Sequence, residues 1–403
     1  MAGLPRGLGA LAHRDFRLFI AGQLVSLVGT WMQSVGQAWL VLELTNSPFR
    51  LGMIGTLQFG PMLLFSFAAG AISDRVRKRR MIIATQTVLM LQALALAVLV
   101  ASGRVEYWHV AILATVYGIA NTFDMPARQA FVADLVGKAD LMNAIALNSA
   151  MFNGARVIGP AAAGLLVARW GAAAAFFVNA ASFVAVIVAL FAVRNDGLPR
   201  PRKAKSLIGE IAEGVRYAVG TPRVALVFGL LLTVSLFVLN YNVFVPLIAR
   251  DVLGEGAHGF GLLMAALGAG AVTGAVIMAW FSQPWPSLPM VIVPALILSI
   301  GTMALAAAHH FASTAGLLGV IGLAQILFMT SCNTTVQIAV PDELRGRLMS
   351  LYAMVFVGMT PIGSFLVGTI AERAGVATAC VAGGGAGLVS ILALTVAARR
   401  HRG

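Results

Sequence analysis

The most regular feature of this sequence is a series of long apolar segments separated by short polar ones. A helix needs about 20 apolar residues to cross the hydrocarbon core of a bilayer, and each segment is close to that length. The pattern therefore predicts an all-α membrane protein with twelve transmembrane helices. The twelve segments lie near residues 18–42, 51–73, 81–101, 108–127, 143–168, 173–193, 224–249, 258–281, 289–308, 311–331, 350–370 and 376–397.

A polar and basic stretch interrupts the series at its midpoint and leaves six segments on either side. We therefore expect an N-terminal six-helix bundle over residues 1–194, a cytoplasmic basic linker over 195–222 and a C-terminal six-helix bundle over 223–403. A short internal repeat supports this division, because the segment Gln129 to Asp134 (QAFVAD) resembles the segment Gln337 to Asp342 (QIAVPD). Two related bundles around a midplane site are the usual architecture for transport by alternating access.

The distribution of positive charge predicts the orientation of the chain. If the N-terminus is cytoplasmic, 22 of the 28 Lys and Arg residues fall on the inner side of the membrane and five on the outer side. Arg156 remains inside a segment. This asymmetry is the one that the positive-inside rule describes, and it predicts cytoplasmic termini in an inner or plasma membrane. The formal net charge of +13 needs no nucleic-acid partner, since helix ends account for it.

The composition agrees with a chain that lies mostly in lipid. The sequence is 59% hydrophobic and 11% charged, whereas a soluble domain has roughly 25% charged residues. The only cysteines, Cys332 and Cys380, fall in apolar segments and are expected to be buried rather than disulfide-bonded. His-Glu-x-x-His, Gly-x-Ser-x-Gly and nucleotide-binding Gly-Lys motifs are absent, which predicts no enzymatic activity, no metal and no cofactor. No cleavable signal peptide is expected.

A polar stripe runs along the first segment. Gln23, Ser26, Thr30, Gln33 and Gln37 recur at steps of three and four residues, which places them on one face of a helix. Amide side chains are costly in lipid, so this face should meet protein or a water-filled cavity. Two interpretations stay open: hydrogen bonds between helices, or contact with a substrate.

We expect five polar residues to line a central substrate cavity: Gln33, Gln37, Asn153, Arg156 and Asn242. Arg156 is the only basic residue well inside a segment, and a charge within the membrane marks a functional site with a partner to be found. Asp124, one helix earlier, is the candidate partner for a structural pair. If Arg156 instead faces the cavity, it favours anionic substrates such as siderophores.

The loop between the second and third segments reads GAISDRVRKRR, from Gly70 to Arg80. It resembles the loop signature of the major facilitator superfamily, Gly-x-x-x-Asp-Arg-x-Gly-Arg-Arg, with Arg77 in place of the second glycine. Gly70 would permit close helix approach, and Asp74 could neutralise the N-terminus of a neighbouring helix. The resemblance implies that this loop, including Arg75 and Arg79, bridges helices when the cytoplasmic side is shut and stabilises the outward-facing state.

Three further strings extend the resemblance to that superfamily. Gly159, Pro160 and Gly164 in the fifth segment form an element similar to the Gly-Pro-x-x-Gly-Gly of exporters. The strings NTFDMPARQ from residue 121 and PDELRGR from residue 341, which contains Arg345, resemble the branch of the enterobactin exporter and macrolide-efflux proteins. The resemblance implies a secondary exporter of a small amphipathic molecule, siderophore or drug-like, driven by the proton gradient. We expect the protein to act as a monomer.

Proton coupling requires a titratable acid near the cavity. Asp124 and Glu43 are the candidates, but both lie near the ends of their segments rather than at mid-membrane. Coupling to protons is therefore implied by the resemblance more than by these residues. Two alternatives also stay open: a transporter of lysophospholipid or another lipid-like substrate, and a sensor or scaffold that kept the fold without transport.

Overall fold

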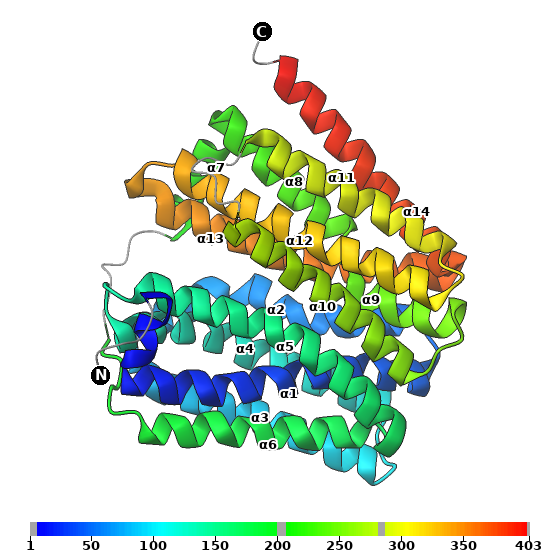
Figure 1. Ribbon diagram of the computed structural model, residues 1–403, viewed down its shortest axis with the longest axis horizontal. Helices are drawn as coiled ribbons and strands as arrows, with labels where there is room; N and C mark the ends of the chain where they lie inside the picture. The colour runs from blue at the N-terminus through cyan, green and yellow to red at the C-terminus, as the bar shows by residue number, and fades with distance from the viewer. Residues whose placement is uncertain (1–5, 200–206, 281–286, 401–403) are drawn as a thin grey trace. The chain divides into compact units, whose positions relative to one another are not determined.

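The structure, a computed structural model, describes residues 6–199, 207–280 and 287–400. Within these ranges the chain is helical apart from short connections, and it contains no β-strand (Figure 1). The predicted all-α class is confirmed. The first residues of the predicted basic linker are described up to residue 199, and residues 200–206 lie outside the described ranges.

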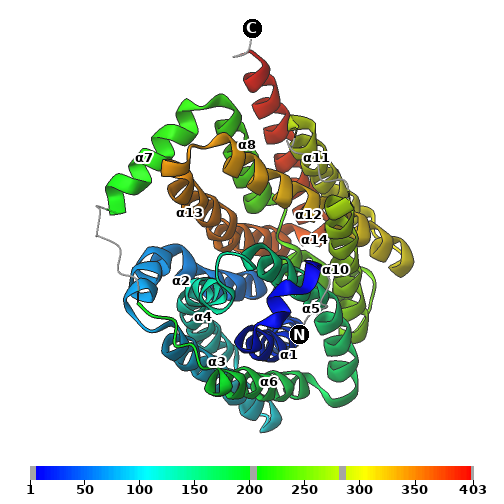
Figure 2. The same cartoon turned by 60° about the vertical axis from the view of Figure 1, so that its left-hand side comes forward.

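The chain folds as two compact units, one of Met1–Leu44 and Gly60–Lys203, the other of Thr45–Phe59 and Ala204–Gly403. Within the first unit, α3 packs between α4 and α6, and Figure 2 shows these helices nearly end-on. The helices that contribute to the first unit are α1 (Arg14–Thr45), α2 (Pro48–Arg75), α3 (Lys78–Ala101), α4 (Tyr107–Val136), α5 (Leu141–Trp170) and α6 (Ala172–Ala192), preceded by a 3₁₀ turn (Arg6–Ala12).

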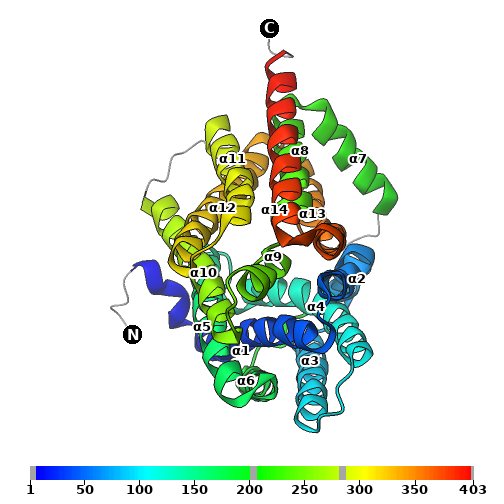
Figure 3. The ribbon, with the colours of Figure 1, turned by 90° about the vertical axis from the view of Figure 1, so that its right-hand side faces the viewer.

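In the second unit α10 packs along α12, and α14 packs along α8 and α11 (Figure 3). Part of the predicted linker forms a helix of its own, α7, which packs on α13. The helices of this unit are α7 (Leu207–Gly220), α8 (Pro222–Phe237), α9 (Tyr241–Leu247), α10 (Ala257–Trp280), α11 (Leu288–Ala304), α12 (Phe311–Ala339), α13 (Asp342–Gly358) and α14 (Thr360–Arg400), with a π-helical turn (Ile248–Val252) after α9 and a 3₁₀ turn (Leu305–Ala307) after α11.

The described residues contain nine helices long and apolar enough to cross a membrane, or ten if the two parts of bent α2 count as one span. One of the nine, Leu344–Ala398, has 55 residues. At 1.5 Å per residue it is about 80 Å long, enough for two crossings. Gly375 interrupts it with a φ of 84°, a left-handed conformation that favours glycine. The prediction of twelve spans is compatible with these lengths and stays a prediction.

Local sequence signals explain where several helices begin and end. The side chain of Glu106 and that of His109 form a reciprocal capping box at the start of α4, which satisfies backbone N–H groups that a helix N-terminus leaves free. Gly137 ends the same helix with a φ of 69°, a conformation typical of the residue after a helix. Pro222 stands in the first turn of α8, where its missing N–H costs nothing.

Candidate functional site

The polar stripe of α1 lies between helices of the first unit. Gln33 is 3% exposed, donates a hydrogen bond to Gln92 of α3 at 3.0 Å and accepts one from Asn179 of α6. Gln23 and Gln37 are buried as well. Of the two interpretations of this stripe, the contacts of Gln33 favour hydrogen bonding between helices. Its predicted place in a substrate cavity stays a prediction.

The contact between α1 and α5 is built around Gly159. A Cβ atom at this position would lie 2.9 Å from the backbone oxygen of Val28 and would also meet the Cβ of Trp31. Pro160 and Gly164, on the same helix, are buried. The absence of a side chain at residue 159 therefore lets α5 touch α1, as small residues do between membrane helices.

One turn before Gly159, an arginine lies over an aromatic ring. The guanidinium carbon of Arg156 is 5.8 Å from the centroid of the Trp31 ring, and the edge of Phe152 meets the same ring at 5.8 Å. A cation within about 6 Å of a tryptophan ring is attracted by its negative face. We call Trp31, Phe152 and Arg156 the Trp31 cluster. It combines positive charge with aromatic surface in the middle of two predicted spans.

The predicted pairing of Asp124 with Arg156 is wrong. Asp124 is fully buried and forms an ion pair with Arg128, one turn later in α4. Its other oxygen accepts hydrogen bonds from Thr85 at 2.7 Å and Gln86 at 3.0 Å, both on α3. The pair therefore joins α4 to α3 rather than to α5. The second predicted acid, Glu43, is exposed at the end of α1 and accepts a hydrogen bond from Trp39 at 2.7 Å.

In the basic loop between α2 and α3, the surroundings of Gly70 and Asp74 differ from those expected. Nothing lies within 4 Å of where a Cβ of Gly70 would be, so the predicted close helix approach at this residue is wrong. Asp74 is half-buried, and among the described residues no hydrogen bond or ion pair links it to a helix N-terminus. Arg75 is exposed. The gating role of the loop stays a prediction.

The arginines of this loop bind the segment that follows α6. Arg79 donates to Asp196 at 2.8 Å and to the backbone oxygen of Leu190 at 2.7 Å, while Arg77 reaches the other oxygen of Asp196 at 3.1 Å. Backbone bonds reinforce this, because the N–H of Lys78 donates to Gly197 at 3.1 Å. The start of the predicted linker is thus fastened to the basic loop.

Asp196 has a pKa below the ordinary aspartate value, first because Arg79 donates a hydrogen bond to it and then because Arg79, Arg77 and Arg80 are positively charged. Because the pKa of Asp196 is lower in the folded chain, its ion pairs stabilise the fold fully at any pH above the pKa of the unfolded chain, near 4. This stabilisation is lost as the pH falls through the lower pKa of the folded chain. At neutral pH the attachment is therefore complete.

Replacing Asp196 by asparagine is expected to loosen this attachment. Exposed ion pairs contribute little, so we expect amide hydrogen exchange at Lys78 and Arg79 to accelerate only a few-fold at neutral pH. Hydrogen-exchange mass spectrometry of peptides covering residues 76–82 would measure it. Asp251→Asn is the control, because the exposed Asp251 pairs with its half-buried neighbour Arg250 at 2.6 Å. Equal exchange in wild type and Asp196→Asn would contradict the role given to Asp196.

The predicted asparagines of the cavity have different surroundings. Asn153 is 8% exposed and donates to the backbone oxygen of Ser149, one turn earlier in α5. Asn242 is exposed. Its neighbour Asn240 is buried where α8 ends and α9 begins, and it accepts a hydrogen bond from Ser364 of α14 at 3.4 Å. Interrupted membrane helices are frequent at transport sites. Whether these residues contact a substrate stays a prediction.

Within the second unit, the first half of α2 packs against α14 through small residues. A Cβ on Gly52 would lie 3.0 Å from the Cα of Gly368 and would also meet the backbone oxygen of Ser364. Thr56 donates to the backbone oxygen of Pro361 at 2.8 Å. We call this contact the α2–α14 seam. Because Gly52 and Gly368 lack side chains, the two backbones approach closely along it.

A carboxylate closes one end of the α2–α14 seam. Glu372 accepts hydrogen bonds from the hydroxyl of Ser47 at 2.8 Å and from the backbone N–H of Phe49 at 3.0 Å. The N–H groups of a first helical turn have no partner within the helix, so Glu372 caps the N-terminus of α2. The ring of Phe49 also meets the edge of Phe365, with centroids 5.7 Å apart.

Helix α7 fastens the linker to the second unit. Glu213 forms an ion pair with Arg347 of α13, and Tyr217 donates to the backbone oxygen of Ala339 at 3.2 Å. Arg345, predicted as a gating residue, is exposed and donates to the backbone oxygen of Gln337 at 3.1 Å. The basic string after α12 therefore holds α12, α13 and the linker helix together.

Sequence reasoning missed Trp31, Asp196, Gly52 and Glu372. Two of them had a visible signal. Gly52 and Thr56 are small residues four apart in an apolar segment, a spacing typical of close helix contacts. Trp31 stands beside Thr30 in the polar stripe. Asp196 and Glu372 had none, since a single acid in a loop or near a helix end does not indicate its partner.

Comparison with known proteins agrees with this architecture. The family model described as transmembrane secretion effector matches residues 6–401. The multidrug efflux pump Tap of Mycolicibacterium fortuitum is 25% identical over 368 residues, which cover 89% of each chain. The staphyloferrin A transporter of Staphylococcus aureus is 26% identical and covers 89% of this chain and 90% of its own. The enterobactin exporter EntS of Salmonella paratyphi A is 25% identical, and the aligned region covers 97% of this chain and 94% of EntS.

Solved structures share the fold at low sequence identity. The nucleoside transporter NupG superposes with a TM-score of 0.75 at 11% identity, covering 95% of this chain and 98% of its own. A POT family transporter in complex with 5-aminolevulinic acid gives a TM-score of 0.76 at 12% identity, covering 99% and 97%. These likenesses show the fold, and the family match over residues 6–401 confirms the predicted family. The chain belongs to the transmembrane secretion effector family, in the exporter branch of the major facilitator superfamily.

Proposed function

We propose that this protein exports a small amphipathic molecule, siderophore or drug-like, by alternating access. The observation that carries the proposal is the match to exporters over nearly the whole chain: the relatives named for drug efflux, staphyloferrin A and enterobactin cover 89–97% of it. The Trp31 cluster supports the same reading, since positive charge beside aromatic surface suits an amphipathic anion.

The proposed setting is a bacterial inner or plasma membrane, with both termini in the cytoplasm and the protein acting as a monomer. The excess of Lys and Arg on one side of the predicted spans supports this orientation. It puts the loop from Gly70 to Arg80 at the inner face and the α2–α14 seam, with Glu372 at its end, towards the outer face. In this view the seam is an outer gate that must part for release of the exported molecule.

We propose that the proton gradient drives export and that Asp124 is the better candidate for the coupling acid. It is fully buried, and its oxygens bind Arg128, Thr85 and Gln86. A proton on Asp124 would weaken the pair with Arg128 and alter the contact between α3 and α4. Glu43 is exposed at a helix end, where such a change would reach fewer neighbours.

Transport into inverted membrane vesicles tests the proposed function. The vesicles would receive either a fluorescent cationic dye or a catecholate siderophore, with and without an imposed pH gradient. Accumulation driven by the gradient is the expected result. Accumulation that ignores the gradient would remove proton coupling and leave export standing. Movement of neither compound would contradict the proposed export and favour the lipid-like substrate or the non-transporting sensor.

Arg156 is expected to determine the preference for anionic cargo. Replacing it by glutamine removes the charge at the Trp31 cluster, and loss of a charge-assisted hydrogen bond lowers affinity roughly tenfold or more. Siderophore accumulation should fall by that factor while dye accumulation changes little. Arg169→Gln is the matched control, because Arg169 lies on the same helix and also over a tryptophan, at 5.5 Å from Trp170. Equal losses for both cargoes would assign Arg156 a structural role.

A further inference from the structure

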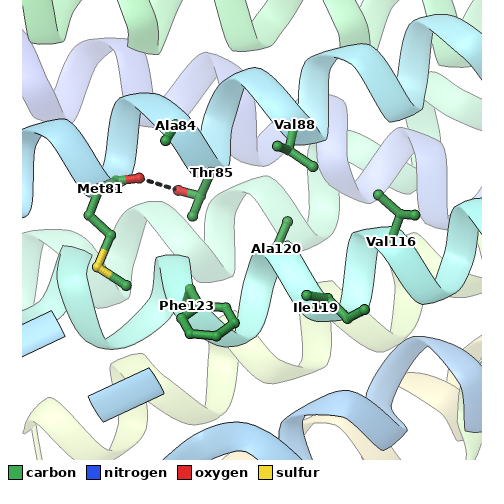
Figure 4. A pocket seen from close by; sticks show the side chains of 8 residues that line it. All are labelled: Met81, Ala84, Thr85, Val88, Val116, Ile119, Ala120 and Phe123. Atoms are coloured by element: carbon green, nitrogen blue, oxygen red, sulfur yellow. Dashed lines mark hydrogen bonds between the residues drawn. The ribbon is translucent and has the colours of Figure 1, made fainter. Parts of the chain in front are cut away.

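An apolar groove runs along the surface of the first unit between α3 and α4 (Figure 4). Its volume is about 410 Å³. Val88 and Ile119 on its walls are 42% and 40% exposed, so the groove is open to the outside of the unit. The lining consists of Met81, Ala84, Thr85 and Val88 from α3 and Val116, Ile119, Ala120 and Phe123 from α4.

The groove offers no polar group to a ligand. Thr85 is the only polar residue of this lining, and its hydroxyl is already used: its single proton is shared among Asp124 at 2.7 Å and the backbone oxygens of Ile82 at 3.0 Å and Met81 at 3.1 Å. Small-molecule sites normally include polar groups that orient the ligand. A hydrocarbon chain needs none. The lining therefore suits the chain of a lipid better than an amphipathic cargo.

The groove is elongated along the helices and begins near the basic loop. Met81 and Phe123 lie at one end, and Val88 and Val116 at the other (Figure 4). From Met81 to Val88 the helix rises about 10 Å, which is most of the roughly 15 Å depth of one leaflet's hydrocarbon. A chain lying in the groove would run parallel to the acyl chains of the adjacent leaflet, with its head at the level of the loop.

One arginine is placed to meet that head. Arg80 stands four residues before Ala84, so it lies on the same face of α3 as the groove. Its neighbours are engaged elsewhere, since Arg79 binds Asp196 and Lys78 binds Asp134 and the backbone oxygen of Leu198. Arg80 is exposed and, among the described residues, forms no hydrogen bond or ion pair, although its charge acts on Asp196.

We propose that this groove binds one acyl chain of an anionic phospholipid and that Arg80 holds the phosphate of its headgroup. Basic residues beside a membrane attract anionic lipids, and each contributes about a fivefold preference. The lipid would cover the exposed apolar walls at Val88 and Ile119 and lie directly over Thr85. The site is distinct from the Trp31 cluster, and it does not depend on which molecule the protein exports.

Native mass spectrometry of the delipidated full-length protein in detergent tests this site. The protein would be titrated with phosphatidylglycerol or with phosphatidylcholine of the same chains. We expect wild type to prefer phosphatidylglycerol roughly fivefold. Arg80→Gln should abolish the preference, and Ala84→Phe, which fills the groove from an exposed position, should remove binding of both lipids. Ile119→Trp fills the groove from α4 and replaces Ala84→Phe in the test if that variant does not fold.

Two matched controls separate the site from general effects. Ala95→Phe adds the same bulk at an exposed position of α3 beyond the groove, and Arg194→Gln removes an exposed charge after α6. Both should bind phosphatidylglycerol as wild type does. Equal binding by wild type, Arg80→Gln and Ala84→Phe would overturn the proposal, as would equal affinity of wild type for the two lipids. Displacement of the lipid by siderophore or dye would assign the groove to the cargo instead.

Discussion

Replacing Gly159 by leucine is expected to reduce transport more than tenfold. A side chain here must displace either the backbone of α1 at Val28 or the side chain of Trp31, because a Cβ alone would already meet both. Overpacking of this kind costs about 1–3 kcal/mol where the structure can yield. Here the structure can relieve the overpacking only if α5 moves away from α1. That movement would also take Arg156 away from the ring of Trp31.

The measurement is accumulation of siderophore and dye in inverted vesicles, normalised to the amount of inserted protein. Gly154→Leu is the matched control: Gly154 lies on the same helix, and nothing is within 4 Å of where its Cβ would be. We expect this control to keep most of its activity. Normal transport by Gly159→Leu would show that the close contact between α1 and α5 is not needed for the transport cycle.

Replacing Gly52 by valine is expected to reduce transport to a comparable extent, here by disturbing the α2–α14 seam, the proposed outer gate. The new side chain would meet the backbone oxygen of Ser364 and the Cα of Gly368, neither of which can rotate away. The α2–α14 seam could then close only with displacement of one helix. If the seam is an outer gate, transport should fall more than tenfold, because alternating access requires the gate to shut as well as to open.

Hydrogen exchange distinguishes a gating defect from misfolding at Gly52. Valine should raise exchange in peptides from residues 47–59 and 360–372 while the rest of the chain keeps its wild-type protection. Gly60→Val provides the control. Gly60 lies on the same helix as Gly52, and nothing is within 4 Å of where its Cβ would be. A Gly52→Val protein with wild-type transport and wild-type exchange would remove the gating role from the seam.

The two glycines illustrate what could be anticipated about the site. Gly159 was identified from its motif, because a Gly-Pro pair in an apolar segment is a signal within one helix. Gly52 was overlooked, although it and Thr56 are small residues four apart at the start of a predicted segment. Gly70 shows the opposite error: its motif matched, yet the structure leaves open space around it. A motif indicates where a small residue stands but not what stands opposite.

Charged residues show the same limit. Arg156 was correctly identified as a charge inside a span, but its predicted partner Asp124 is bound by Arg128 of the same helix. The i, i+4 spacing of Asp124 and Arg128 was visible in the sequence and is a frequent pairing on helices. The attachment of Asp196 to Arg79 could not be anticipated, since 117 positions separate them.

The sequence by itself determined the helical class, the membrane setting and the family, because each depends on local properties: apolar length, charge at segment ends and short motifs read along one chain. Only the tertiary structure decided that Gln33 bonds α3 and α6, that Arg156 lies over Trp31 and that Glu372 caps α2. The physical reason is that helices in lipid are stable one by one, so hydropathy specifies each without its neighbours. Which side chains meet depends on how each helix is rotated and packed, and close packing and hydrogen bonds between helices settle that.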